Sequence, residues 1–269
     1  MIIDSHTHIF PDEIAAHAIP NLIAAAGGKL ESFTDGTLKG LLKSMENSKI
    51  DYSVALPVAN DSSHSKEIFN WIIQSRKQTQ KVVFFSSIHP ADNEFKERMK
   101  EMSEEGIRGI KMHPQYQSFA VDDDAVFPIY EEAAKNELII HFHSGQDVAF
   151  PNSDYASAPR FRKVLDQFPE LKIVLAHAGG YKEWNRAYQN YHDKKVYFDI
   201  SFALHHLIQK EDKYLAKLFE EKEDFFLFGT DSPWRDQKAD IDLLNTSDYF
   251  SDSQKEKLLY RNAKKLLKI

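Results

Sequence analysis

The sequence contains no cysteine. Disulfide bonds, thiolate metal sites and cysteine nucleophiles are therefore excluded, so any metal ion must be bound through nitrogen and oxygen atoms. Basic residues are also in deficit, because 34 Lys and Arg stand against 41 Asp and Glu, a formal net charge of −7. A general nucleic-acid binder or a membrane-surface protein needs a basic face. The charge therefore argues against both partners and leaves a small-molecule substrate open.

Long hydrophobic runs are absent as well. No apolar run approaches the ~18 residues that would cross a bilayer, and no basic-then-apolar signal segment precedes the opening MIIDSHTH. We therefore expect no membrane partner and a cytoplasmic location. Glycine loops of the Walker type and a GxSxG nucleophile elbow are also missing, so phosphate-cradling loops and serine-nucleophile chemistry have no support.

Short apolar, β-branched runs recur at fairly regular intervals, at residues 1–8, 52–58, 82–88, 107–113, 138–144, 172–178, 196–202 and 225–231. Several are almost continuously hydrophobic, which is typical of parallel strands covered on both faces. Helical patterns alternate with them, such as residues 37–49 with apolar positions on one face. Eight such units predict an α/β fold, a (β/α)8 barrel that spans residues 1–269 as a single domain. We interpret residues 11–36 as an elaborated loop after the first strand.

Histidine is concentrated at the ends of these predicted strands. Seven of the 12 histidines lie in or just after the apolar runs: His6, His8, His89, His113, His141, His143 and His177. Strand ends occupy so little of such a chain that only about one or two would fall there by chance. In a (β/α)8 barrel, the active site is built at the carboxyl ends of the strands. The sequence therefore predicts a histidine-rich site at that face.

His6 and His8 are spaced so that both side chains point to the same side of a strand. They could be two core histidines bonded to their neighbours, but burying adjacent imidazoles without a cation is costly. His143, His177 and Asp231 occupy equivalent positions on later strands. Four imidazoles and one carboxylate suit Zn²⁺ or a similar divalent ion. We therefore predict a metal site, most simply one zinc ion bound by these five residues.

Five motifs together resemble the amidohydrolase superfamily of metal-dependent barrels: DSHTH at 4–8, GIKMHP at 109–114, HFHSG at 141–145, LAHAGG at 175–180 and GTDSPW at 229–234. The likeness spans the whole chain. FPELKIVLAHAGG at 168–180 and YRNAKKLL at 260–267 are similar to the amidohydrolase-related branch that includes aminocarboxymuconate semialdehyde decarboxylase.

The resemblance implies roles for further residues. The family's strand-five ligand precedes a small residue and a glycine, which matches His143 and leaves His141 as a supporting or core histidine. Asp4 is expected to support a ligand or a neighbouring group through a hydrogen bond. Lys111 and His113 are candidates for a second metal ion or for substrate contact, since some superfamily members carboxylate a strand-four lysine. One ion is expected, because the resembled branch usually holds one, and two remain open.

Hydrolysis of an amide, lactone or ester by metal-activated water is the leading functional hypothesis. Asp231 would act as general base and then acid, and His177 would stabilise an oxyanion. The alternative is non-oxidative decarboxylation of a small aromatic or unsaturated acid, which calls for a cation to hold the substrate carboxylate. A metal-binding protein without catalysis and a phosphoesterase are weaker alternatives. The arginines near strand ends that could hold a carboxylate are Arg160, Arg162, Arg186 and Arg235.

The loops after the strands carry aromatic and amide side chains that suit a small, partly planar organic substrate. They are Phe10, Asn60, Gln115, Tyr116, Phe119, Gln146, Phe150, Tyr181, Phe202 and Trp234. The identity of the substrate and the oligomeric state, including a homo-oligomer, stay open at this point.

Overall fold

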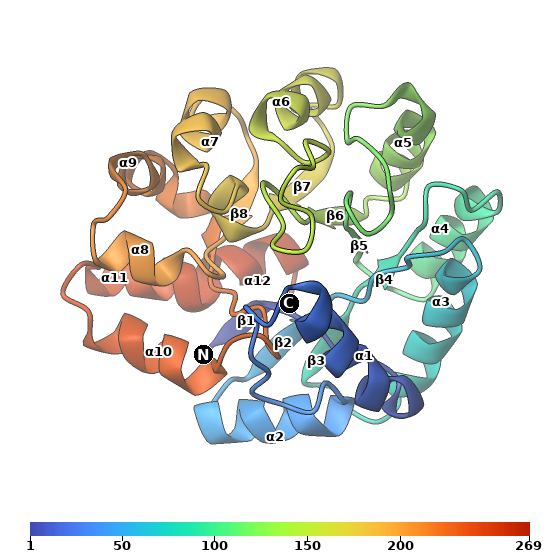
Figure 1. Ribbon diagram of the computed structural model, residues 1–269, viewed down its shortest axis with the longest axis horizontal. Helices are drawn as coiled ribbons and strands as arrows, with labels where there is room; N and C mark the ends of the chain where they lie inside the picture. The colour runs from blue at the N-terminus through green and yellow to red at the C-terminus, as the bar shows by residue number, and fades with distance from the viewer.

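Parallel strands close into a barrel in the computed structural model, which describes residues 1–269 (Figure 1). The strands are β1 Ile3–Thr7, β2 Tyr52–Ala55, β3 Val82–Phe84, β4 Ser86–Ser87, β5 Gly109–Met112, β6 Ile139–Phe142, β7 Lys172–Leu175, β8 Tyr197–Asp199 and β9 Phe226–Leu227. Hydrogen bonding orders them β1-β2-β3 and β4-β5-β6-β7-β8-β9. Only Phe85 separates β3 from β4, so these two segments form the third strand of the barrel.

Main-chain hydrogen bonds join the last strand to the first. The Ser5 amide donates to the Phe228 carbonyl over 2.8 Å, and the Asp231 amide donates to the His6 carbonyl over 2.7 Å. Thr7 and Ser232 also form a parallel bridge. The ring is therefore closed, and the predicted (β/α)8 barrel is confirmed.

Helices surround the barrel and follow the strands in alternation (Figure 1). They are α1 Asp12–Ala25, α2 Leu38–Ser48, α3 His64–Ser75, α4 Phe95–Glu104, α5 Phe127–Lys135, α6 Ala158–Gln167, α7 Trp184–Tyr191, α8 Leu204–Ile208, α9 Lys213–Lys222, α10 Gln237–Thr246, α11 Asp252–Glu256 and α12 Asn262–Leu267. No helix is both long enough and apolar enough to span a membrane.

The interpretation of residues 11–36 as a loop is wrong for residues 12–25, which form α1. Only Ala15 and Ile19 of this helix are buried, and Pro20 lies inside it. An apolar stripe is the sequence signal of a packed helix, and proline interrupts helical patterns. The weak stripe and the proline together explain why the sequence did not reveal α1.

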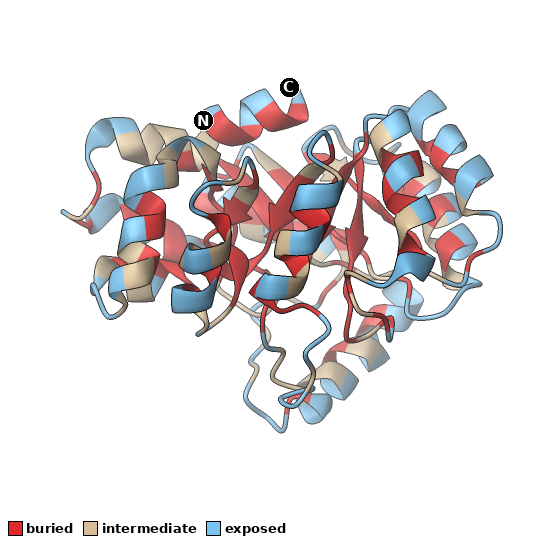
Figure 2. Ribbon diagram, turned by 90° about the horizontal axis from the view of Figure 1, so that it is seen from above, coloured by how far each residue is buried: buried red, intermediate tan, exposed pale blue.

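Two apolar layers position the site. Outward side chains of the strands pack against the surrounding helices in the main core. Inside the barrel, Ile3, Ile139 and Val174 belong to a second apolar cluster that α12 covers through Leu266 and Leu267. Figure 2 shows buried strands at the centre and the C-terminus on the face opposite to the projecting loops. The apolar floor leaves the other end of the barrel for polar side chains.

Candidate active site

Three imidazoles and one carboxylate meet at the carboxyl ends of the strands. His6 and His8 come from the end of β1, His177 follows β7, and Asp231 follows β9. The Nε2 atoms of His6 and His8 lie 3.1 Å apart, and Asp231 Oδ1 lies 3.1 Å from His8 Nε2 and 3.5 Å from His6 Nε2. His177 Nε2 is 3.9 Å from Asp231 Oδ2. We call these four residues the inner cluster.

Hydrogen bonds on the far side of each β1 imidazole fix its tautomer. His6 Nδ1 donates to Asp199 Oδ2 over 3.0 Å, and His8 Nδ1 donates to the Leu56 carbonyl over 2.7 Å. Because both partners are acceptors, the proton of each neutral ring sits on Nδ1. The lone pair of each Nε2 therefore faces Asp231. This is the arrangement in which imidazoles bind metal ions.

His177 reaches the cluster from a strained turn. His177 and the following Ala178 have φ values of 57° and 55°, in the left-handed region that residues other than glycine rarely adopt. His177 Nδ1 lies 2.9 Å from Ser201 Oγ and 3.3 Å from the Ser201 carbonyl. The carbonyl can only accept, so Nδ1 carries the proton. Nε2 of the third imidazole therefore carries a lone pair, and it lies 3.2 Å from His143 Nδ1 and 3.9 Å from Asp231 Oδ2.

The inner cluster lacks hydrogens where its ligand atoms face one another. Asp231 Oδ1 is buried without a hydrogen-bond donor, and the hydrogen-bond donor near His6 Nε2 is the Lys111 ammonium, at 3.4 Å. Electron pairs that face one another repel unless a cation lies between them. Metal–ligand bonds of ~2.1 Å in a tetrahedron put neighbouring ligand atoms ~3.4 Å apart. The separations of 3.5 and 3.1 Å between Asp231 Oδ1 and the Nε2 atoms of His6 and His8 therefore fit a divalent ion.

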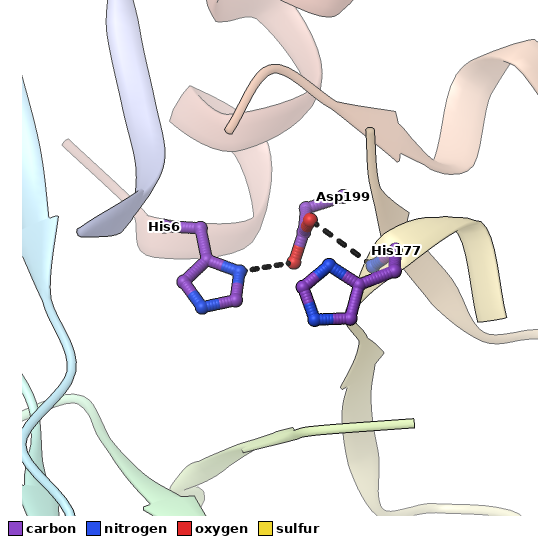
Figure 3. A group of neighbouring side chains, drawn as sticks. All are labelled: His6, His177 and Asp199. Atoms are coloured by element: carbon purple, nitrogen blue, oxygen red, sulfur yellow. Dashed lines mark hydrogen bonds and ion pairs between the residues drawn. The ribbon is translucent and has the colours of Figure 1, made fainter. Parts of the chain in front are cut away.

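Asp199, which belongs to none of the five motifs, accepts hydrogen bonds from the imidazole rings of His6 and His141. It accepts hydrogen bonds from His6 Nδ1 at 3.0 Å and from the His177 amide at 3.3 Å (Figure 3). A third comes from His141 Nε2 at 2.8 Å. Burial opposes its ionisation, but the interactions with His6 and His141 hold its pKa well below the usual range. Its single sequence signal is an acidic residue within the apolar run at 196–202.

Asp4 contacts the backbone rather than an imidazole. Its carboxylate accepts hydrogen bonds from the His6 amide at 3.2 Å, from Thr230 and from Gln237 of α10. The pairing register between β1 and β2 shifts between Asp4 and Thr7. Asp4 therefore fixes the main chain on either side of the inner cluster.

Lys111 of β5 is a buried cation beside the inner cluster. It is 1% exposed, and no carboxylate lies within ion-pairing distance. Burial lowers its pKa to about 8, although Asp231 and Asp199 oppose this shift. The ammonium group borders the cavity and is available to an anionic ligand.

A second group of ligating side chains lies beside the first. His113 follows β5, His143 follows β6, and Asp147 is in the next loop. Asp147 Oδ2 lies 3.4 Å from His113 Nε2 and 4.0 Å from His143 Nε2. His143 Nδ1 lies 3.2 Å from His177 Nε2, so His143 separates the two groups. We call His113, His143 and Asp147 the outer cluster; Asp147 carries no motif signal in the sequence.

The four arginines considered for a substrate carboxylate do not line the cavity. Each is paired with an acidic residue elsewhere: Arg160 with Asp122, Arg162 with Asp193, Arg186 with Glu183 and Arg235 with Asp240. These acidic partners hold the four side chains away from the cavity, so the structure brings none of the candidate arginines to the site.

A cavity of about 1070 Å³ opens above both clusters. Seven of the ten predicted loop residues line it: Phe10, Asn60, Tyr116, Gln146, Tyr181, Phe202 and Trp234. Gln115 instead donates to the Gly145 carbonyl, Phe119 joins the core, and Phe150 packs edge-on against Tyr116. Helix α1 forms one side of the cavity, which the sequence did not predict. Its lining residues are Glu13, Ile14, Ala18, Asn21 and Leu22.

Known proteins share this architecture. The structure of 5-carboxyvanillate decarboxylase from Novosphingobium aromaticivorans with bound manganese superposes with a TM-score of 0.75 at 12% identity, covering 100% of this chain and 97% of that chain. For 2,6-dihydroxybenzoate decarboxylase from Rhizobium, the TM-score is 0.70 at 14% identity, covering 99% of this chain and 98% of that chain. At these identities the likeness establishes the fold.

Two sequence comparisons add to this. The chain is 22% identical over 125 residues to a dihydroorotase from Mycosarcoma maydis, a match that covers 42% of this chain and 32% of that protein. The chain thus spans about a third of that relative's length. The sequence model of the amidohydrolase family matches residues 3–269, which include every strand of the barrel and both clusters. The chain belongs to the amidohydrolase family.

Proposed function

We propose that the chain is a metal-dependent decarboxylase of a small aromatic or unsaturated carboxylic acid. The observation that carries this proposal is Lys111, a buried ammonium beside the inner cluster with no carboxylate partner. An unpaired buried cation is costly unless an anion reaches it. A substrate carboxylate held by Lys111 would supply that anion. Two decarboxylases with the same fold support this reading over our leading sequence-based hypothesis of hydrolysis.

His6, His8, His177 and Asp231 would hold one divalent ion. When bound, the ion supplies a positive charge that polarises the substrate and stabilises negative charge as the bond breaks. Imidazole ligands suit zinc, and the manganese in the related decarboxylase makes Mn²⁺ a second candidate. Around the ion, the charges of Asp199, Asp231 and Lys111 sum to −1 with neutral imidazoles, so a divalent ion brings the total to +1. A site with that charge attracts a monoanionic acid.

Asp231 would move the proton. Loss of CO₂ breaks a C–C bond and leaves its electron pair on carbon, which must take up one proton. Asp231 is the ionised group of the inner cluster that borders the cavity. It would take a proton from water and deliver it to this carbon. Tyr116, Phe202 and Trp234 would hold the plane of the substrate.

Hydrolysis of an amide, lactone or ester is the second candidate, and the dihydroorotase match favours it. In that reaction Asp231 would take a proton from the attacking water and pass it to the leaving group. His177 would stabilise the oxyanion only where it is not committed to the ion. The two reactions share the inner cluster and differ in the role of Lys111.

A turnover screen of protein loaded with Zn²⁺ or Mn²⁺ tests the proposal. The panel holds hydroxylated aromatic and unsaturated carboxylates on one side, and lactones, cyclic amides and esters on the other. We expect CO₂ release from at least one acid. We also expect Lys111→Met to raise KM for that acid by at least ~10-fold, the scale of a lost charge-assisted contact. Lys182→Met, at the cavity edge, is the control. A new carboxyl group from the second set, without CO₂ from the first, would establish the hydrolase instead.

A further inference from the structure

We propose that the cavity binds a substrate with an apolar arm, an unbranched alkyl chain on the side of the acid remote from its carboxylate. The arm would lie between α1 and α3, which are on the same side of the barrel (Figure 1). We call this part of the cavity the arm compartment; it is lined by Ile14, Ala18 and Leu22 of α1 and by Ile68 and Trp71 of α3. The inference rests on the proposed function for the head of the substrate and adds its tail.

The volume of the cavity exceeds that of a single-ring acid. An aromatic ring fits a cavity of ~150 Å³, whereas this cavity measures about 1070 Å³. Pockets of ~300–1,000 Å³ enclose most of a drug-sized ligand. A ring held by Tyr116, Phe202 and Trp234 would occupy the part lined by segments after β5, β8 and β9. The part lined by segments after β1 and β2 would stay unfilled, so the cavity suits a longer substrate.

Two apolar helix faces line the arm compartment. Ile14, Ala18 and Leu22 are spaced four residues apart and therefore share one face of α1. Ile14 is 50% exposed, and neither Ile14 nor Leu22 belongs to an apolar core cluster. Ile68 and Trp71 are partly buried at the edge of the core and border the same cavity. Apolar side chains that gather on a surface without being covered are typical of a ligand-binding groove.

Helix α1 packs on the protein through a different face. Its buried side chains are Ala15 and Ile19, which lie about 100° around the helix from the face that lines the arm compartment. The core therefore holds the helix without covering its second apolar face. Three charged side chains also border this side of the cavity, and all are exposed, so each can extend into water. They are Glu13, Lys29 and Glu67.

The apolar stripe on α1 sets the length of the arm. From Ile14 to Leu22 the helix rises by ~12 Å, at ~1.5 Å per residue. An extended alkyl chain advances by ~1.2 Å per bond, as an extended backbone does, so about eight to ten carbons match the stripe. Such a chain would remove both helix faces from water while the carboxylate at the other end of the substrate reaches Lys111.

Binding to a series of chain lengths tests the arm without requiring turnover. The probes are salicylate and salicylates with a straight butyl, octyl or dodecyl chain para to the carboxylate, below their micelle concentrations. Calorimetry measures Kd for the zinc-loaded protein. Burying one methylene is worth up to ~4-fold in affinity, so we expect the octyl compound to bind at least ~100-fold more tightly than salicylate. The dodecyl compound should gain little more, because its chain outgrows the stripe.

Two variants and a matched control locate the chain. Ala18→Trp fills the middle of the stripe, and Leu22→Gln makes it polar. In both variants the ratio of the salicylate Kd to the octylsalicylate Kd should fall by at least ~10-fold. Ala16→Trp makes the same substitution at an exposed position of α1 outside the cavity, and it should keep the wild-type ratio. Circular dichroism of each variant confirms that the barrel has folded.

A wild-type ratio near one would overturn the proposal, and so would equal ratios in Ala18→Trp and Ala16→Trp. A wild-type dimer that Leu22→Gln dissociates on gel filtration would assign the face to a second copy of the chain instead. The proposed function fails separately. Tight octylsalicylate binding without CO₂ release from any acid would keep the arm compartment and refute the decarboxylase. Release of CO₂ from single-ring acids without a gain from chain length would refute the arm alone.

Discussion

Asp199 accepts hydrogen bonds from two imidazoles, two main-chain amides and the Ser201 hydroxyl, while no motif in the sequence marks it. Because it fixes the proton of His6 on Nδ1, it presents Nε2 to the ion. We expect Asp199→Asn to lower the affinity for the inner ion by ~10–100-fold, the usual effect of losing a group that orients a ligand. Competition titration with a chelator measures the affinity.

The control for this variant is Asp193→Asn, which removes the same charge from a surface pair with Arg162. Its metal affinity should match that of the wild type. Equal affinity in Asp199→Asn would show that the tautomer of His6 is set by other contacts, such as Ser201 Oγ at 3.2 Å.

Asp231 has a different role, because it faces the cavity and carries the proton. Asp231→Asn should keep most of the inner ion, since His6, His8 and His177 remain. Asparagine cannot accept or deliver a proton, so we expect turnover to fall by ~10²–10⁴-fold. The measurement is the rate at matched metal occupancy. A rate within about threefold of the wild type would exclude this role for Asp231.

The site residues that belong to spaced motifs could be predicted from the sequence, and those outside such motifs could not. The sequence predicts that His6, His8, His143, His177 and Asp231 meet, because they stand at equivalent strand ends. The structure brings four of them into the inner cluster and places His143 beside His113 and Asp147. Asp147 could not be predicted in the same way, because a loop has no fixed periodicity. Asp4, expected to support a ligand or a neighbouring group, accepts hydrogen bonds from the His6 amide, Thr230 and Gln237.

At the scale of elements, the loops after β6 and β7 pass each other at Gly145. Its φ is +82°, and an added Cβ would lie 2.6 Å from the Gly180 Cα and 2.8 Å from the Tyr181 amide nitrogen. Both contacts are with main chain, which cannot move aside as a side chain can. The close approach therefore places His143 and His177 side by side.

Gly145→Ala should be strongly destabilising. The left-handed conformation costs ~1 kcal/mol for alanine, and the steric overlap adds ~1–3 kcal/mol. Gly106→Ala is the matched control, because its φ is +73° and nothing lies within 4 Å of the added Cβ. Denaturant unfolding should give a loss of ~1 kcal/mol for the control and at least twice that for Gly145→Ala. Equal losses would show that the loops can separate.

Across the molecule, the alternation of apolar runs and amphipathic helices was enough to predict the barrel. It could not predict α1, whose contacts are mostly with the cavity rather than with the core. A hydrophobic pattern in the sequence indicates a helix or strand through the face that the element buries. An element with little buried surface therefore leaves no clear pattern.

Metal removal should lower the stability of the whole barrel. The inner ion would tie together β1, β7 and the segment after β9, and a ligand that binds only the folded state stabilises it by ~4 kcal/mol at a thousandfold excess over Kd. We expect a chelator to lower the Tm by several degrees and added Zn²⁺ to restore it. His6→Ala/His8→Ala should show a much smaller response, because it lacks two ligands of the inner ion. An unchanged Tm after verified metal loss would contradict this coupling.

The position of α1 affects how substrate and product enter and leave the cavity. This helix forms one side of the cavity, yet only two of its side chains are buried. Segments with few buried contacts open at a small fraction of the free energy of global unfolding. We therefore expect backbone amides at 12–25 to exchange with deuterium orders of magnitude faster than those of β5 and β6, and to slow when a substrate analogue fills the cavity. The opening of helix α1 would then control access to the cavity. The rate of this opening, rather than the chemical step, would limit product release.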